Sequence, residues 1–314
     1  MELKYISGRE VFEKLDMETC IGLMKDLFTA LSDKKAENKL RSVLPIDSGK
    51  LMGIMPGSLP YTGTVGAKLI TVFHDNYKIG KPSHQGIVAL FSTEDGQPLG
   101  VCDGMAITAV RTGAVSGLAT DLLAAKDART LCLIGGGMQA SMHLKSMMCV
   151  RDIKKVNVWC PTVEESDRFI ASHRDEYPGV EFYSYADCQK AVEDADIICT
   201  VTLSKTPVLR GEWVKKGAHI NAVGACAAAD RELDSPLVAE SRFFCDSLVS
   251  CTNESGDYLY PLKEGLIDES HILAELGDVL TGKKSGRTGE DDITIFESLG
   301  LAREDLACAV RLLK

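Results

Sequence analysis

The sequence has no apolar run approaching 18 residues, so nothing in it predicts a membrane-spanning helix. Positive charge is in deficit. The 35 Lys and Arg residues against 45 Asp and Glu give a net charge of −10, which disfavours nucleic acid and acidic membranes as main partners. The opening residues, MELKYISGREVFEKLD, carry charges where a signal peptide needs an apolar core, so we expect no signal peptide.

Metal-binding and disulfide patterns are also missing. The eleven cysteines are dispersed without a Cys-x-x-Cys pair, and the six histidines form no His-x-x-x-His pair or His/Cys cluster. An odd, scattered set of thiols is typical of reduced, mostly buried cysteines in the cytoplasm. We therefore expect a cytoplasmic protein without a metal site.

The most informative feature present is the run Thr130-Leu-Cys-Leu-Ile-Gly-Gly-Gly-Met-Gln-Ala140, followed by a helix-like stretch over 139–150 and a strand over 155–159. Gly135 permits a tight turn, Gly137 lets the backbone approach a pyrophosphate, and Ala140 lets the helix pack on the strand. The run predicts the first strand-turn-helix of a dinucleotide-binding fold. A purely structural glycine turn is the alternative.

Two regions of the chain differ in the order of their predicted helices and strands. Before residue 113 we expect a helix capped by Asp16, strands over 63–73, 86–92 and 98–102 with a hairpin turn at Asp95-Gly96, and a helix over about 105–125. From Thr130 strands and helices alternate, as in a parallel, doubly wound α/β sheet. Strands are predicted near 130–134, 155–160, 180–184, 196–201, 218–223, 242–246 and 293–297, and a last helix over 303–314.

Three cations in the first 111 residues are candidates for holding a substrate. Lys68 interrupts the apolar strand Val65-Gly-Ala-Lys-Leu-Ile-Thr-Val72, so it lies at an edge, snorkels, or faces a polar cleft where desolvation lowers its pKa. Arg111 lies in a small-residue helix, and Arg41 in a polar stretch. An arginine is the natural fork for a carboxylate, although a structural salt bridge is the simpler explanation for Arg111.

Several blocks, in order along the chain, closely resemble the ornithine cyclodeaminase/mu-crystallin family: KPSHQGIVALF, DGQPLGVCDG, ITAVRTGAVSG, GGGMQA, GEWVKKGAHINAVGA, RELD, AELGDVL and IFESLG. The resemblance covers essentially the whole chain. It implies a Rossmann-type dinucleotide-binding domain over 114–298. It also implies an α+β substrate-binding domain that builds a homodimer, formed by 1–113 together with 299–314.

The resemblance also implies residue roles. Arg41 and Arg111 would clamp the α-carboxylate of a small amino or imino acid, and Lys68 would act beside the nitrogen on the α-carbon. The residues expected at the coenzyme, NAD or NADP, are Ser83, Thr112, Gly135, Gly137, Met138, Gln139, Cys160, Thr202, Val223, Gly224 and Ser298.

Two departures from the family pattern concern the substrate. Ornithine cyclodeaminase has an Asp where this chain has Cys226, and Asp230 aligns four residues late. It also has a Glu shortly before the Met-Pro pair that is Met55-Pro56 here, and this stretch lacks a carboxylate. A buried ammonium without a counter-charge is costly, so ornithine is an unfavourable substrate. Met55, Cys226 and Asp230 are the candidate pocket residues.

The coenzyme choice stays open between NAD and NADP, because Val158-Trp-Cys-Pro-Thr162 offers neither an acid for the ribose hydroxyls nor an Arg for a 2′-phosphate. The absence of a repelling acid slightly favours NADP. We expect an NAD(P)-dependent oxidoreductase acting on the carbon–nitrogen bond of a small α-amino or α-imino acid. The alternatives are a cyclodeaminase that recycles NAD, and a nucleotide-dependent binding protein without turnover.

Overall fold

The computed structural model describes residues 3–34, 37–47 and 49–314, which form two compact units. Unit 1 comprises residues 1–111 and 301–314, and unit 2 comprises residues 112–300. Each unit has its own sheet, and the helix α3 (Gly104–Leu123) contains the boundary at residue 111. None of the helices in the described ranges combines the length and the hydropathy that a bilayer crossing requires.

Unit 1 is built on a seven-stranded sheet whose path runs β1-β7-β6-β5-β4-β2, with β3 paired to β4. All pairings are antiparallel except that between β1 and β7. The strands are β1 (Tyr5–Ile6), β2 (Glu37–Asn38), β3 (Ser42–Asp47), β4 (Lys50–Leu59), β5 (Thr64–Phe73), β6 (His84–Ser92) and β7 (Pro98–Asp103). Three further helices belong to this unit: α1 (Gly8–Lys14), α2 (Met17–Ser32) and α11 (Ala302–Leu313).

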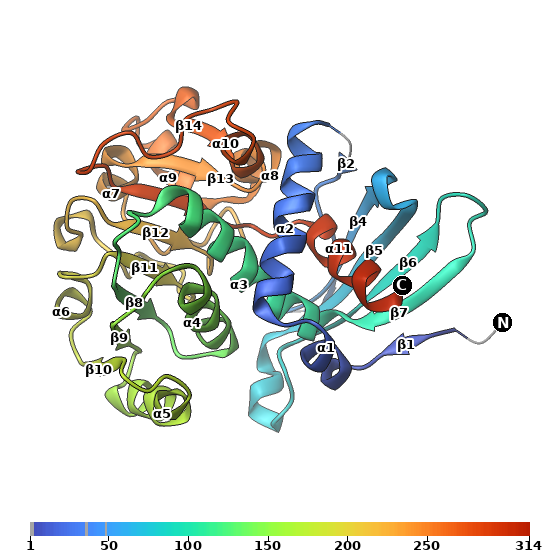
Figure 1. Cartoon of the computed structure of the whole chain (residues 1–314), viewed down its shortest axis with the longest axis horizontal. Coiled ribbons are helices and arrows are strands. Elements are labelled where there is room, and N and C mark those ends of the chain that lie inside the picture. The colour runs from blue at the N-terminus through green and yellow to red at the C-terminus, as the bar shows by residue number, and fades with distance from the viewer. Residues whose placement is uncertain (1–2, 35–36, 48) are drawn as a thin grey trace. The chain divides into compact units, whose positions relative to one another are not determined.

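One face of this sheet is covered by α11, which packs against α2 and against strands β4 to β7 (Figure 1). Helix α2 is capped by Asp16, as predicted: the Asp16 carboxylate accepts a hydrogen bond from the Thr19 amide. Residues 301–309 of the α11 segment are all buried, although three of them are charged. The last helix therefore brings charge into the interior of unit 1.

Unit 2 is a parallel eight-stranded sheet in the order β10-β9-β8-β11-β12-β15-β13-β14. The first five strands follow the 3-2-1-4-5 order of a dinucleotide-binding fold, with the reversal between β8 and β11. The sixth position, beside β12, is taken by β15, which follows β13 and β14 in the chain. The strands are β8 (Thr130–Ile134), β9 (Lys155–Trp159), β10 (Glu181–Tyr185), β11 (Ile197–Thr200), β12 (His219–Ala222), β13 (Arg242–Cys245), β14 (Ile272–Glu275) and β15 (Thr294–Glu297).

Both faces of this sheet are buried, as a parallel sheet requires. Leu131 and Leu133 of β8 join one apolar cluster, and Cys132 and Ile134 join another. The first cluster includes residues of α4 (Met138–Val150) and α5 (Val163–His173). The second includes residues of α6 (Cys188–Val192), α7 (Ser235–Glu240), α8 (Leu248–Glu254) and α9 (Gly256–Lys263), while α10 (Leu276–Leu280) follows β14.

The predicted fold class and the predicted strands are confirmed, most with ends shifted by no more than two residues. The helices expected after Asp16 and Thr130 are present, and the turn at Asp95-Gly96 has Gly96 at φ +75°. The prediction missed β1, β2, β3, β4, β14 and α1.

Candidate functional site

The predicted glycine turn joins β8 to α4 in unit 2. Gly135 has φ +118°, and a Cβ there would lie 2.8 Å from the backbone oxygen of Val201, so only glycine fits. Gly137 is the N-cap of α4, and a Cβ there would meet no atom within 4 Å. The turn therefore leaves open space in front of the amide groups at the start of α4, as a bound pyrophosphate requires.

Five predicted coenzyme residues follow the carboxyl ends of five neighbouring strands. Cys160, Gly135, Thr202, Val223 and Ser298 come after β9, β8, β11, β12 and β15, which is their order across the sheet. The Gly135 amide donates to the Trp159 oxygen, and the Val223 amide donates to the Thr200 oxygen. These residues span four strand spacings, about 19 Å. Ligands of open α/β sheets bind along this edge.

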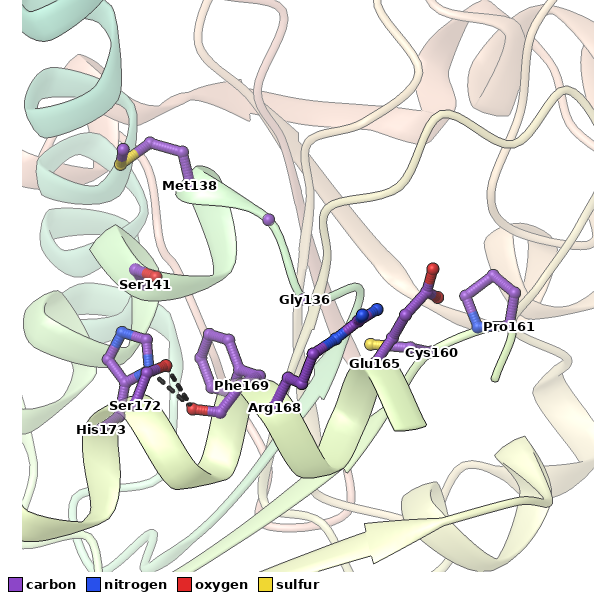
Figure 2. A pocket seen from close by; sticks show the side chains of 11 residues that line it. Gly136, Met138, Ser141, Cys160, Pro161, Glu165, Arg168, Phe169, Ser172 and His173 are labelled. Atoms are coloured by element: carbon purple, nitrogen blue, oxygen red, sulfur yellow. Dashed lines mark hydrogen bonds between the residues drawn. The ribbon is translucent and has the colours of Figure 1, made fainter. Parts of the chain in front are cut away.

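A cavity of about 590 Å³ opens at the β9 end of this edge (Figure 2). Predicted residues contribute Gly137, Cys160 and the exposed side chain of Met138. The other lining residues were not anticipated from the sequence, and most belong to α5: Gly136, Ser141, Pro161, Glu165, Arg168, Phe169, Ser172 and His173.

A buried carboxylate, that of Glu232, forms hydrogen bonds with the two loops that follow β11 and β12. Glu232 accepts hydrogen bonds from the Thr202 amide at 2.7 Å and the Thr202 hydroxyl at 2.6 Å. It also accepts one from the Gly224 amide at 2.7 Å. Burial raises the pKa of Glu232, and these hydrogen bonds oppose the rise. Thr202 and Gly224 are thus fixed by a residue that the site prediction had not included.

Ser298 carries a hydroxyl that suits a ligand at the same edge. Its side chain is 2% exposed, and its amide donates to the Ala222 oxygen at 2.9 Å. Within the described ranges its Oγ has no hydrogen-bond partner. A buried hydroxyl without a partner is costly, so the residues fit a coenzyme that offers an amide or hydroxyl group there. Thr112, on α3, is also buried, and Gln139 lies in the first turn of α4.

The charged cluster of unit 1 is centred on Lys68, which lies on the central strand β5 and is 3% exposed. Its Nζ lies 3.3 Å from both carboxylate oxygens of Asp305, on α11. Burial is the largest influence on this lysine and lowers its pKa to about 8. The Asp305 charge opposes that shift, while Arg111 and Arg41 add to it.

Arg111 is held by two buried acids of α11. Its Nε lies 3.1 Å from Asp305 Oδ1, and its Nη1 lies 2.5 Å from Glu304 Oε2. Burial raises the pKa of Glu304, and the Arg111 charge opposes the rise. Both acids lie in the first turn of α11, where the helix dipole favours negative charge. Arg111 therefore makes buried salt bridges, and its two partners hold the guanidinium in a fixed position.

Met55 and Arg41 belong to the same unit. Met55 on β4 pairs in register with Lys68, so the two side chains lie on the same face of the sheet, and Met55 is buried. Arg41 lies between β2 and β3, and its positive charge contributes to lowering the pKa of Lys68. Ser83 lies beside Phe73, five residues along β5 from Lys68, a separation of about 17 Å. The structure therefore does not place Ser83 in the charged cluster.

The other two candidate pocket residues belong to unit 2. Cys226 is half-buried after β12, and its Sγ donates to the Val223 oxygen at 3.4 Å. Asp230 is half-buried in the same loop, before Glu232. In the described part of the chain, no three His, Cys, Asp or Glu side chains are grouped as metal ligands.

The strand order and glycine turn define unit 2 as a dinucleotide-binding α/β domain. The chain as a whole belongs to the ornithine cyclodeaminase/mu-crystallin family, which it matches over residues 4–313. The resemblance deduced from the sequence is thereby confirmed.

Similar proteins in this family include imine reductases. The chain is 37% identical to a Delta(1)-pyrroline-2-carboxylate reductase of Bacillus cereus, covering 97% of this chain and 94% of the relative. It is 38% identical to the ketimine reductase mu-crystallin of Mus musculus, covering 86% and 82% of the two chains. The solved structure of Thermococcus litoralis Delta(1)-pyrroline-2-carboxylate reductase in complex with NADH and L-proline superposes with a TM-score of 0.94. It is 35% identical and covers 98% of this chain and 96% of that chain.

Proposed function

We propose that this protein reduces the carbon–nitrogen double bond of a small cyclic α-imino acid, with Delta(1)-pyrroline-2-carboxylate as the first substrate to test. The observation that carries the proposal is the buried Lys68–Asp305–Arg111 cluster, in a chain that also has the parallel sheet and the glycine turn of a dinucleotide-binding fold. Named relatives that reduce such imines support it.

The reduction adds a hydride to carbon and a proton to nitrogen. The nicotinamide coenzyme supplies the hydride when bound, and this chain must supply the proton and hold the substrate. The Lys68 pKa of about 8 leaves an ammonium group at neutral pH whose proton is not tightly held. Lys68 Nζ is therefore suited to donate a proton to the imine nitrogen.

The arginines provide the orientation that hydride transfer needs. Arg111, with Arg41 as a second cation, would hold the substrate carboxylate, which fixes the adjacent α-carbon. Asp305 is a positioning residue: it fixes Lys68 Nζ and Arg111 Nε in one arrangement. Met55 supplies an apolar wall beside Lys68. Cys226 and Asp230 remain proposed pocket residues.

The coenzyme is proposed to bind along the carboxyl edge of unit 2. Gly135 and Gly137 make room for the pyrophosphate, and Met138 and Gln139 begin the helix behind it. Val223, Gly224 and Ser298 would face the nicotinamide, with Thr202 held beside them by Glu232. Thr112 and Ser83 complete the proposed coenzyme residues. Solved relatives with NADH or NAD+ support this assignment.

An apolar face of unit 1 supports a homodimer. Ile54 pairs with Leu69 and Leu69 with Ile87, while Val65 pairs with Phe91, so these side chains share the face opposite Lys68. Ile54, Val65, Ile87 and Phe91 are all at least 37% exposed. A solved relative is an archaeal alanine dehydrogenase dimer. Eleven cysteines without a disulfide in the described chain agree with a cytoplasmic location.

The decisive experiment follows the absorbance of NADH and NADPH with Delta(1)-pyrroline-2-carboxylate, with the product analysed by chromatography. We expect one reduced coenzyme to be consumed for each proline formed. Ornithine given with catalytic NAD tests the cyclodeaminase alternative, in which proline forms without net coenzyme consumption. Coenzyme binding without turnover of any imine would instead support the binding protein.

A further inference from the structure

The cavity beside β9 carries two opposite charges where the adenosine half of a coenzyme is expected. Glu165, Arg168, Phe169 and Ser172 follow the i, i+3, i+4 and i+7 spacing of one face of α5, and all four line the cavity. Cys160, directly after β9, lines it as well. In dinucleotide-binding folds the end of the second strand is where the ribose 2′ position is recognised, and β9 is that strand here.

The residues at the end of β9 do not themselves distinguish a 2′-hydroxyl from a 2′-phosphate. Cys160 is a buried thiol packed against the glycine turn, because a Cβ on Gly136 would lie 2.7 Å from its Sγ. Pro161 follows and offers no side-chain donor or charge. Recognition of the 2′ position must therefore come from another part of the cavity, and α5 supplies its ionisable side chains.

Arg168 is the cation of this cavity. Its side chain is exposed and extends toward Gly136 and Cys160 (Figure 2). Within the described residues it makes no ion pair or hydrogen bond, whereas Arg151 of the same unit makes six hydrogen bonds. The Glu165 carboxylate lies one turn earlier, beside Cys160 and Pro161. The two charges act oppositely on the pKa of Cys160: Glu165 raises it and Arg168 lowers it.

We propose that Arg168 binds the 2′-phosphate of NADP(H), that Glu165 accepts a hydrogen bond from the 2′-hydroxyl of NAD(H), and that the chain therefore binds both coenzymes. This inference rests on the proposed function for the presence of a dinucleotide in the cavity. A guanidinium and a phosphate form a charge-assisted, bidentate contact, whereas a carboxylate repels the phosphate and accepts from the hydroxyl. Coenzyme choice is thus assigned to one face of α5.

The test measures binding directly, without turnover. The affinities of wild type, Arg168→Gln and Glu165→Gln for NADPH and NADH are measured by calorimetry or by fluorescence of the reduced nicotinamide. We expect Arg168→Gln to weaken NADPH binding about 10- to 100-fold and to leave NADH within about twofold. Glu165→Gln should strengthen NADPH binding several-fold and weaken NADH binding.

A matched control is Arg174→Gln, which removes an exposed cation just beyond α5 that does not line the cavity. It should bind both coenzymes as wild type does. Adenosine 2′,5′-bisphosphate and 5′-AMP serve as probes of the phosphate alone: Arg168→Gln should weaken only the first. Thermal unfolding of each variant confirms that the exposed substitutions leave the fold intact.

The other outcomes overturn the assignment. Equal loss of NADPH and NADH in Arg168→Gln would mean that this arginine contacts a part common to both coenzymes. Unchanged NADPH affinity, or a wild type that binds only NADH, would exclude Arg168 as the phosphate ligand. A wild type that binds neither coenzyme would refute the proposed function and this inference together. A wild type that binds both but reduces no imine would refute the proposed reaction alone.

Discussion

Removing the charge of Asp305 should move the pH dependence of imine reduction. In the proposed reaction Lys68 must be protonated, so activity should fall as pH rises through the pKa of this lysine, near 8. The Asp305 carboxylate raises that pKa, because it stabilises the ammonium group. Asp305→Asn keeps the shape and removes the charge. The Lys68 pKa should therefore fall, and the alkaline limb of the kcat profile should move to lower pH.

The separation of 3.3 Å sets the size of the effect. Coulomb's law gives about 1 kcal/mol for this distance at the dielectric constant of water, and about 5 kcal/mol at an effective value of about 20. One pKa unit corresponds to about 1.4 kcal/mol, so the smaller figure already moves the pKa by about one unit. We expect the limb at pH 7 or below in Asp305→Asn, with a lower maximum rate because Arg111 also loses a partner.

The assay is the initial rate of NADH or NADPH oxidation across pH, at saturating imine, with folding checked by circular dichroism. Thr108→Val is the matched control, since it removes a hydrogen bond to Asp305 Oδ1 but leaves every charge in place. Its limb should stay near pH 8. An unmoved limb in Asp305→Asn, with the protein folded, would show that Lys68 is not the group whose protonation limits the rate.

Four further predictions test other parts of the site. Lys68→Ala should lower kcat by about 10²–10⁴ while coenzyme affinity, measured by fluorescence, stays unchanged; activity within a few-fold of wild type would refute its role. Arg111→Lys should raise the KM for the imine about tenfold or more, because Lys lacks the planar fork, and unchanged kinetics would make Arg111 purely structural. Ornithine should be a poor substrate by proline chromatography, and Cys226→Asp should gain affinity for it; rapid proline formation by wild type would contradict this. Gly135→Ala, forced into φ +118°, should lose about 1–3 kcal/mol of stability in denaturant unfolding together with coenzyme binding. Gly137→Ala should fold normally because its space is open, so equal destabilisation of the two variants would count against the geometry of the turn.

The alternating part of the fold could be predicted because buried parallel strands are short apolar runs separated by helices. The expected strand at 130–134 matches β8, and the turn after it has the one glycine, Gly135, that the backbone requires. Strands β3 and β4 were missed because their apolar residues do not alternate cleanly. Met55 is buried while Leu44 and Ile54 are exposed, and Pro45 and Pro56 interrupt the pattern.

The cations of the site were predictable and their counter-charges were not. A lysine in an apolar strand can be recognised as unusual from the flanking residues alone, and Lys68 is indeed buried. Glu304 and Asp305 lie more than 190 residues from Arg111 in a helix that reads as an ordinary amphipathic surface helix. One signal was available: a buried lysine and arginine require acids, and Arg303-Glu304-Asp305 is a charged run in a helix whose only other charged residue is Arg311. Arg168 was missed because only the residues directly after β9 were considered.

The chain order of the two units has a consequence for biosynthesis. Unit 2 is one continuous segment, 112–300, so all of it has been translated before residue 301 is added. Unit 1 is interrupted, because α11 follows unit 2 and carries both acids that neutralise Lys68 and Arg111. During synthesis, Lys68 and Arg111 therefore have no counter-charge, and one face of the unit 1 sheet stays uncovered, until α11 emerges from the ribosome. The charged cluster thus cannot form before α11 has been added, and a released chain truncated before residue 302 should leave Lys68 and Arg111 without their acids.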